Sequence, residues 1–176
     1  MKPIIALTMG DPGGIGPEII LKSLQKTPHK HIQLIGSIEV FKYASRRLHL
    51  PFNPEKVNFL DVTNEAEQMA PKAAFSMGKI SRWNAALAYT SLKKAASLAK
   101  RGRIQALVTA PVQKTGIRLV DPKFLGHTEY LAKSAGVKEF AMMFVSDRLK
   151  VTLATIHLPI KKVAAALKTK EITSKI

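Results

Sequence analysis

The feature that most constrains the fold of this chain is a regular alternation of short apolar runs with longer amphipathic segments. The short runs predict β-strands over residues 4–9, 32–36, 57–60, 104–109, 140–145 and 151–156. Apolar residues at helical spacing predict helices over 17–25, 39–48, 81–100, 128–135 and 160–167. Strands that alternate with helices are typical of parallel sheets covered by helices. The sequence therefore predicts an α/β fold with a mostly parallel sheet flanked by helices.

Composition narrows the class of protein further. The chain has 176 residues and is 46% apolar, enough for one sizeable domain or for part of a larger protein. It has no cysteine, which excludes disulfides and thiolate metal sites and fits a reducing compartment. No apolar stretch is long enough to span a membrane, and the N-terminus lacks a signal-peptide pattern. We expect a cytoplasmic protein without a membrane partner.

The net charge of +16 permits nucleic-acid binding as an interpretation. The basic residues, however, come singly or in pairs such as Arg46-Arg47 and Lys161-Lys162, without interleaved aromatic residues or zinc-finger spacing. Solvated helix faces and attraction for an anionic substrate explain the charge at least as well. We expect no nucleic-acid partner.

The opening stretch "LTMGDPGGIGPEII", residues 7–20, is a predicted strand, a glycine-rich turn and a helix start. Its glycines do not fit the dinucleotide fingerprint, and no Gly-Lys-Ser/Thr follows to make a P-loop. One interpretation is an ordinary tight turn. The other is a ligand loop, because ligands of open α/β sheets bind beyond the carboxyl ends of strands.

Three later stretches carry candidate site residues. In "ALVTAPVQK", Lys114 follows a predicted strand and could bind an anion, although a surface lysine is the commoner case. In "LGHTEYLAKSAG", Thr128 is a plausible N-cap, and His127 would lie at a helix start that can bind phosphate or carboxylate. An ordinary capped helix explains this stretch equally well.

The third stretch, "VTLATIHLPI", places His157 at the end of a predicted strand. A lone histidine is usually structural, and a zinc-type site needs three or four ligands. The other histidines show no metal-binding spacing with His157. Any further ligands would therefore have to come from elsewhere.

In this order and spacing, "TMGDPGGIGPEI", "GKIS", "ALVTAPVQK", "GHTEYLA" and "TIHLPIKKV" resemble the 4-hydroxythreonine-4-phosphate dehydrogenase family of vitamin B6 biosynthesis. The opening loop is also similar to that of isocitrate and isopropylmalate dehydrogenases, whose fold that family shares. The resemblance extends from Ile4 to the last residue. It implies that residues 1–176 are the N-terminal part of a two-domain α/β dehydrogenase, apparently truncated.

The resemblance implies a specific reaction. Members oxidise 4-phosphooxy-L-threonine with NAD to 2-amino-3-oxo-4-phosphooxybutanoate, which loses carbon dioxide to give 3-amino-2-oxopropyl phosphate for pyridoxal 5'-phosphate. His127 and Thr128 match the residues that bind the substrate, and Lys114 lies in the matching T-A-P-x-x-K. His157 matches the first of three histidines that bind a divalent cation, which would be zinc, magnesium or cobalt. Members are homodimers with a shared active site.

Several alternatives remain open at this point. A close relative would act on 4-phospho-D-threonate or D-erythronate, and the sequence does not separate these substrates. The later metal-binding histidines and most of the cofactor-binding region of the family have no counterpart here, and the catalytic group is not identified. We therefore also consider a catalytically inert fragment, and we expect residues 1–176 alone to be inactive.

Overall fold

The structure, a computed structural model, describes residues 3–27, 30–75 and 77–175. The chain divides into two compact units, Met1–Tyr130 and Leu131–Ile176, which are described separately. The helix α6 (His127–Ala135) contains the point of division. No helix in the described ranges combines the length and the apolar character needed to cross a membrane.

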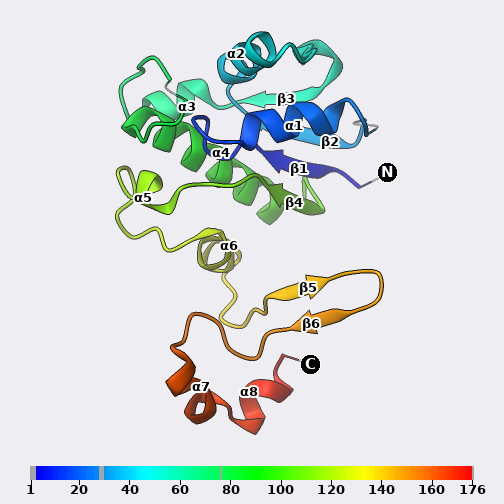
Figure 1. Ribbon diagram of the computed structural model, residues 1–176, viewed down its shortest axis with the longest axis vertical. Helices are drawn as coiled ribbons and strands as arrows, with labels where there is room; N and C mark the ends of the chain where they lie inside the picture. Colours follow the sequence, from blue (N-terminus) through cyan, green and yellow to red (C-terminus); the bar gives the residue numbers. More distant parts are fainter. Residues whose placement is uncertain (1–2, 28–29, 76, 176) are drawn as a thin grey trace. The chain divides into compact units, whose positions relative to one another are not determined.

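The first unit is built on a parallel four-stranded sheet in the order β3-β2-β1-β4 (Figure 1). The strands are β1 (Ile5–Thr8), β2 (Ile32–Gly36), β3 (Asn58–Asp61) and β4 (Ala106–Thr109). In the central register, Leu7 lies opposite Leu34 on one side and opposite Val108 on the other. The predicted α/β class and the parallel sheet are thus confirmed for this unit.

Helices cover both faces of the sheet, with α1 (Gly16–Leu24) and α4 (Arg82–Lys100) on opposite faces (Figure 1). Residues of β2 alternate between the two faces. Leu34 packs in a cluster with residues of α1 and of α2 (Ile38–Leu48), whereas Ile35 packs with Ala95 of α4. The inner strand β2 is buried on both faces, which explains why its run is apolar, whereas the edge strand β4 leaves Val108 51% exposed.

Three short elements escaped the sequence analysis because each is too short to show a periodic pattern. They are the 3₁₀ helix Pro54–Lys56, α3 (Thr63–Glu67) and α5 (Lys114–Ile117). A further short helix is α8 (Thr169–Thr173). The long helix predicted over residues 81–100, by contrast, is confirmed as α4, which begins one residue later than predicted. The Ser81 side chain caps α4 by accepting a hydrogen bond of 3.0 Å from the Asn84 N–H.

The strand order creates a switch point between β1 and β4. The chain moves outward from β1 to β2 and β3, and then crosses by α3 and α4 to add β4 on the other side of β1. The loops that follow β1 and β4 therefore meet at the carboxyl edge of the sheet, where ligands of such sheets bind. Their backbones are joined by a hydrogen bond of 2.9 Å from the Asp11 N–H to the Pro111 carbonyl.

The second unit contains the antiparallel hairpin β5 (Met143–Val145) and β6 (Lys150–Thr152), followed by α7 (Ile160–Ala166) and α8. The predicted strands 140–145 and 151–156 are therefore shorter than expected, and they do not extend a parallel sheet. Phe144 and Val145 are 61% and 67% exposed. An apolar run indicates a strand, but it reveals neither the direction of its partner nor whether its side chains are covered.

The first prediction concerns the close approach of Gly10 to the loop that follows β4. Its φ is 73°, and a Cβ atom there would lie 2.5 Å from the Pro111 carbonyl oxygen. We expect Gly10→Ala to lower the free energy of unfolding by about 3 kcal/mol, because it combines a strained φ with displacement of the β4 loop.

The matched control is Gly102→Ala, which has a φ of 66° with nothing within 4 Å of its Cβ position. This control should cost only about 1 kcal/mol, the strain of the left-handed backbone alone. Urea unfolding of both variants measures the difference. Equal losses would show that the close approach of the two loops contributes nothing.

Candidate functional site

The loop between β1 and α1 is held by backbone hydrogen bonds on two sides. Asp11 Oδ1 accepts from the Gly13 N–H at 2.9 Å, and the Asp11 carbonyl accepts from the Gly14 N–H at 3.0 Å. The Gly78 N–H donates to the Gly13 carbonyl at 2.7 Å, which ties the loop to the segment before α4. The loop is therefore a fixed part of the carboxyl edge.

Asp11 is the acidic side chain of this edge. Burial raises the pKa of its carboxyl, and the hydrogen bond from the Gly13 N–H opposes this shift only in part. It lines a small cavity of about 10 Å³, room for one water molecule, together with Ser81, Asn84 and Gln113. Sequence analysis missed Asn84 as a cavity residue because its pattern shows only a helix.

Lys114 and the start of α6 come together at the backbone of Gly126. A Cβ atom on Gly126 would lie 3.2 Å from Lys114 Nζ and 2.9 Å from Glu129 Oε2. His127 is the next residue and begins α6, with Thr128 in the same turn. The structure thus places the three predicted substrate residues, Lys114, His127 and Thr128, in one region of the first unit.

The predicted role of Thr128 as N-cap is wrong. The helix begins at His127, and the Tyr130 N–H donates to the Gly126 carbonyl at 3.1 Å. The rule that places Ser or Thr before a helix failed here because glycine can also occupy the position before the first helical residue. Thr128 is half-buried inside the first turn, so its hydroxyl belongs to the surroundings of His127.

The His127 imidazole is the least satisfied polar group of this region. Its Nε2 is buried and has no hydrogen-bond partner within the described part of the chain. Burial lowers the pKa of the imidazole, and the positive charge of Lys114 lowers it further. A buried polar atom without a partner costs about 1–3 kcal/mol, so a ligand that supplied the partner would recover this free energy.

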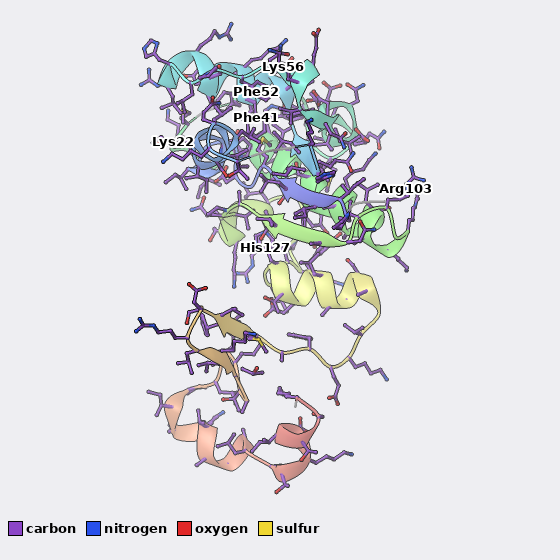
Figure 2. The ribbon with its side chains drawn as sticks, turned by 90° about the vertical axis from the view of Figure 1, so that its right-hand side faces the viewer. Lys22, Phe41, Phe52, Lys56, Arg103 and His127 are labelled. Atoms are coloured by element: carbon purple, nitrogen blue, oxygen red, sulfur yellow. The ribbon has the colours of Figure 1, made fainter. Side chains whose placement is uncertain are left out.

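These features together make this region a candidate anion-binding site, in which the half-buried His127 ring lies near Lys114 and the Glu129 carboxylate. Lys114 supplies a positive charge, and the first turn of α6 presents backbone N–H groups that have no partner inside the helix. Figure 2 shows His127 beyond the β4 side of the sheet. A small ligand that carries both an anionic group and a hydroxyl matches this set of donors and acceptors.

His157 is placed differently from the prediction. It lies in the second unit beyond the end of β6, in an exposed bend with a φ of 58°. Within the described ranges, no three or more His, Cys, Asp and Glu side chains gather in a way that could bind a metal ion. The described residues therefore do not form a complete metal site, and the role of His157 stays a prediction.

The fold and the candidate site define the chain as an α/β protein with a ligand-type loop cluster at a strand switch point. Residues 18–176 match the family model described as "Pyridoxal phosphate biosynthetic protein PdxA". The chain belongs to this family, as the sequence resemblance predicted.

Individual relatives agree with the family match. The chain is 34% identical to a 4-hydroxythreonine-4-phosphate dehydrogenase of Aquifex aeolicus, over 100% of this chain and 56% of the relative. It is 32% identical to the D-threonate 4-phosphate dehydrogenase of Salmonella typhimurium, over 98% of this chain and 56% of the relative.

A solved structure shows the same fold. The crystal structure of 4-hydroxythreonine-4-phosphate dehydrogenase from Klebsiella pneumoniae aligns with a TM-score of 0.84 at 28% identity. The alignment covers 97% of this chain and 56% of that one. The chain thus spans little more than half the length of the relatives it matches.

The second prediction concerns the charge beside His127. We expect Lys114→Met to raise the pKa of His127, because it removes the like charge, yet to leave this pKa below the ordinary histidine range, because burial persists. An NMR titration of the His127 ring proton measures the change.

Lys56→Met is the control, since Lys56 lies beyond the β3 side of the sheet and far from His127 (Figure 2). It should leave the titration of His127 unchanged. If both variants give the wild-type titration curve, Lys114 does not act on His127.

Proposed function

We propose that the first unit carries substrate-binding residues of an NAD-dependent dehydrogenase that acts on 4-phosphooxy-L-threonine. The observation that carries the proposal is the buried Nε2 of His127, which has no hydrogen-bond partner among the described residues, in a ring close to the cationic Lys114. The names of the relatives support the substrate class, since two of them are called 4-hydroxythreonine-4-phosphate dehydrogenases and share 34% and 37% of aligned residues with this chain.

Each residue has a distinct task in this proposal. Lys114 and the N–H groups at the start of α6 bind an anionic group of the substrate. His127, kept neutral by burial and by Lys114, forms a hydrogen bond with a substrate oxygen through Nε2. Thr128 adds a hydroxyl from the same turn. The net charge of +16 raises the local concentration of such an anion.

The proposed reaction follows from the chemistry of this substrate. The secondary hydroxyl is oxidised to a ketone, and NAD accepts the hydride. The product, 2-amino-3-oxo-4-phosphooxybutanoate, has its ketone β to a carboxylate and loses carbon dioxide to give 3-amino-2-oxopropyl phosphate, a step of pyridoxal 5'-phosphate biosynthesis. The first unit contributes binding and orientation of the phosphorylated substrate, which lowers the barrier by fixing its geometry.

A divalent cation (zinc, magnesium or cobalt) and a homodimer with a shared active site also belong to the proposed enzyme. We assign no step to the cation, because the described residues do not supply a complete set of donors. His157 is the residue proposed to bind it. A cytoplasmic location completes the proposal.

A second candidate substrate is 4-phospho-D-threonate or D-erythronate. Relatives named D-threonate 4-phosphate dehydrogenase are 32% and 33% identical to this chain, close to the values for the first group. These substrates share the phosphate and the hydroxyl, so Lys114 and His127 do not discriminate between them. NADH absorbance measured with each substrate in turn, and with the cation present, separates the two candidates from each other and from an inert fragment.

The third prediction tests whether the buried Nε2 of His127 binds the substrate. We expect His127→Ala to weaken binding of 4-phosphooxy-L-threonine roughly tenfold or more, because a hydrogen bond to a charged ligand contributes about 1.5–3 kcal/mol. The melting temperature should stay close to that of the wild type, since the variant removes a polar atom that lacks a partner.

Isothermal calorimetry and thermal unfolding measure the two effects. His31→Ala is the matched control, because this exposed histidine lies at the amino end of β2, away from the carboxyl edge. A His127→Ala variant that melts early but binds the substrate normally would assign the imidazole to the fold.

The fourth prediction concerns the metal. We expect the wild-type chain to bind zinc weakly, because His157 is the single donor proposed here, and we expect His157→Ala to abolish the heat of this binding in calorimetry. His31→Ala again serves as control and should leave zinc binding unchanged. Zinc binding that survives in His157→Ala would remove His157 from the proposal.

A further inference from the structure

The segment between α5 and α6, residues 118–126, decides where His127 lies. It contains turns but no strand or long helix, so no regular ladder of hydrogen bonds fixes its position. Local bonds shape it instead. The Lys123 N–H donates to Asp121 Oδ1 at 3.1 Å, the Phe124 N–H donates to the Asp121 carbonyl at 3.0 Å, and Arg118 Nε donates to the Phe124 carbonyl at 3.0 Å.

One hydrogen bond joins this segment to the core helix α4. The Tyr89 hydroxyl donates to Asp121 Oδ2 at 2.6 Å. Tyr89 is only 9% exposed, and burial followed by the bond to Asp121 raises the pKa of its hydroxyl. The hydroxyl therefore keeps its proton and remains a donor to the carboxylate, the stronger kind of hydrogen bond.

The ring of Tyr89 contacts the chain on both sides of His127. Phe124 precedes His127 and lies 5.9 Å from Tyr89 between ring centroids, while Tyr130 follows it and lies at 5.5 Å. Phe124 and Tyr130 are also in contact, at 6.1 Å. Phe124 is 2% exposed, so this cluster is a packed part of the first unit.

α4 is itself fixed in the core. Leu87 and Leu92, which flank Tyr89 on the helix, are each 1% exposed. The Tyr89 side chain therefore starts from a fixed part of the core and can hold the residues that it contacts in place. The contacts of Tyr89 with Asp121, Phe124 and Tyr130 attach the segment around His127 to the core of the first unit.

We propose that Tyr89 and Asp121 are positioning residues of the site, whose hydrogen bond sets the place of His127 relative to Lys114. The proposal rests on the proposed function in one respect, because it takes His127 as a substrate-binding group. Neither residue touches the ligand in this proposal. Their effect on binding arises because small displacements of a binding group weaken its interaction with the ligand.

The fifth prediction uses Tyr89→Phe, which removes the hydroxyl and keeps the ring. We expect the amide protons of Phe124 and Tyr130 to exchange about tenfold faster, while those of β1 and β2 stay protected. The affinity for 4-phosphooxy-L-threonine should fall about tenfold as well. Asp121→Ala should have the same two effects, and the double variant should be no worse than either single variant.

Two further variants separate positioning from general stability. Tyr43→Phe is the control. It removes the hydroxyl of a tyrosine on α2, whose ring packs against Phe75 and not against Asp121. It should change neither exchange at Phe124 nor affinity. Asp121→Asn can still accept from Lys123 and pair with the Tyr89 hydroxyl, so it should restore most of the affinity lost in Asp121→Ala.

Amide exchange tests the positioning role of Tyr89 and Asp121, and substrate binding by the wild-type chain tests the proposed function. Two results would overturn the positioning role of Tyr89. One is amide exchange at Phe124 and Tyr130 that stays at the wild-type rate in Tyr89→Phe. The other is a loss of affinity that only follows a lowered melting temperature. If the wild-type chain does not bind 4-phosphooxy-L-threonine, the proposed function fails, and amide exchange together with the NMR titration of His127 still decides whether Tyr89 positions the segment.

Discussion

The contact between the backbones that follow β1 and β4 is the constraint on which the site depends. The Asp11 N–H reaches the Pro111 carbonyl because Gly10 has no side chain at a point 2.5 Å from that oxygen. The contact fixes the loop after β1 against the loop that leads to Lys114. The parallel sheet places the carboxyl ends of β1 and β4 side by side, and the hydrogen bond between their loops joins the two loops at one edge of the sheet.

The electrostatics of the site follow from placing one lysine beside one half-buried histidine. Burial disfavours the charged form of the His127 imidazole and the positive charge of Lys114 disfavours it further, so the pKa of the ring is lowered. The Glu129 carboxylate also lies beside Gly126. The unfolded chain binds a proton at this histidine more readily than the folded chain does. The stability of the fold therefore rises with pH through the ordinary histidine range, and binding of an anion opposes the effect of Lys114 on the ring.

Much of the first unit could be predicted from the sequence, because its strands are short apolar runs and its long helices have clear periodicity. The strand 32–36 was predicted with its true bounds, and the start of the long helix was predicted one residue early, because Ser81 is its N-cap. The hairpin of the second unit was not predicted, because the pattern of an apolar run does not reveal the direction of its partner. The N-cap at Thr128 failed because glycine, the residue before His127, also occupies such positions.

The candidate site was predictable in part, and the limit is physical. Lys114 and His127 follow recognisable patterns, but their proximity depends on a chain path through α5 and the segment 118–126, where no periodic signal exists. The Tyr89–Asp121 hydrogen bond was missed for the same reason, because it joins a helix interior to an irregular segment far along the chain. Motifs thus indicate the candidate ligand-binding groups, whereas the residues proposed to position them become visible only when the packing around α4 is known.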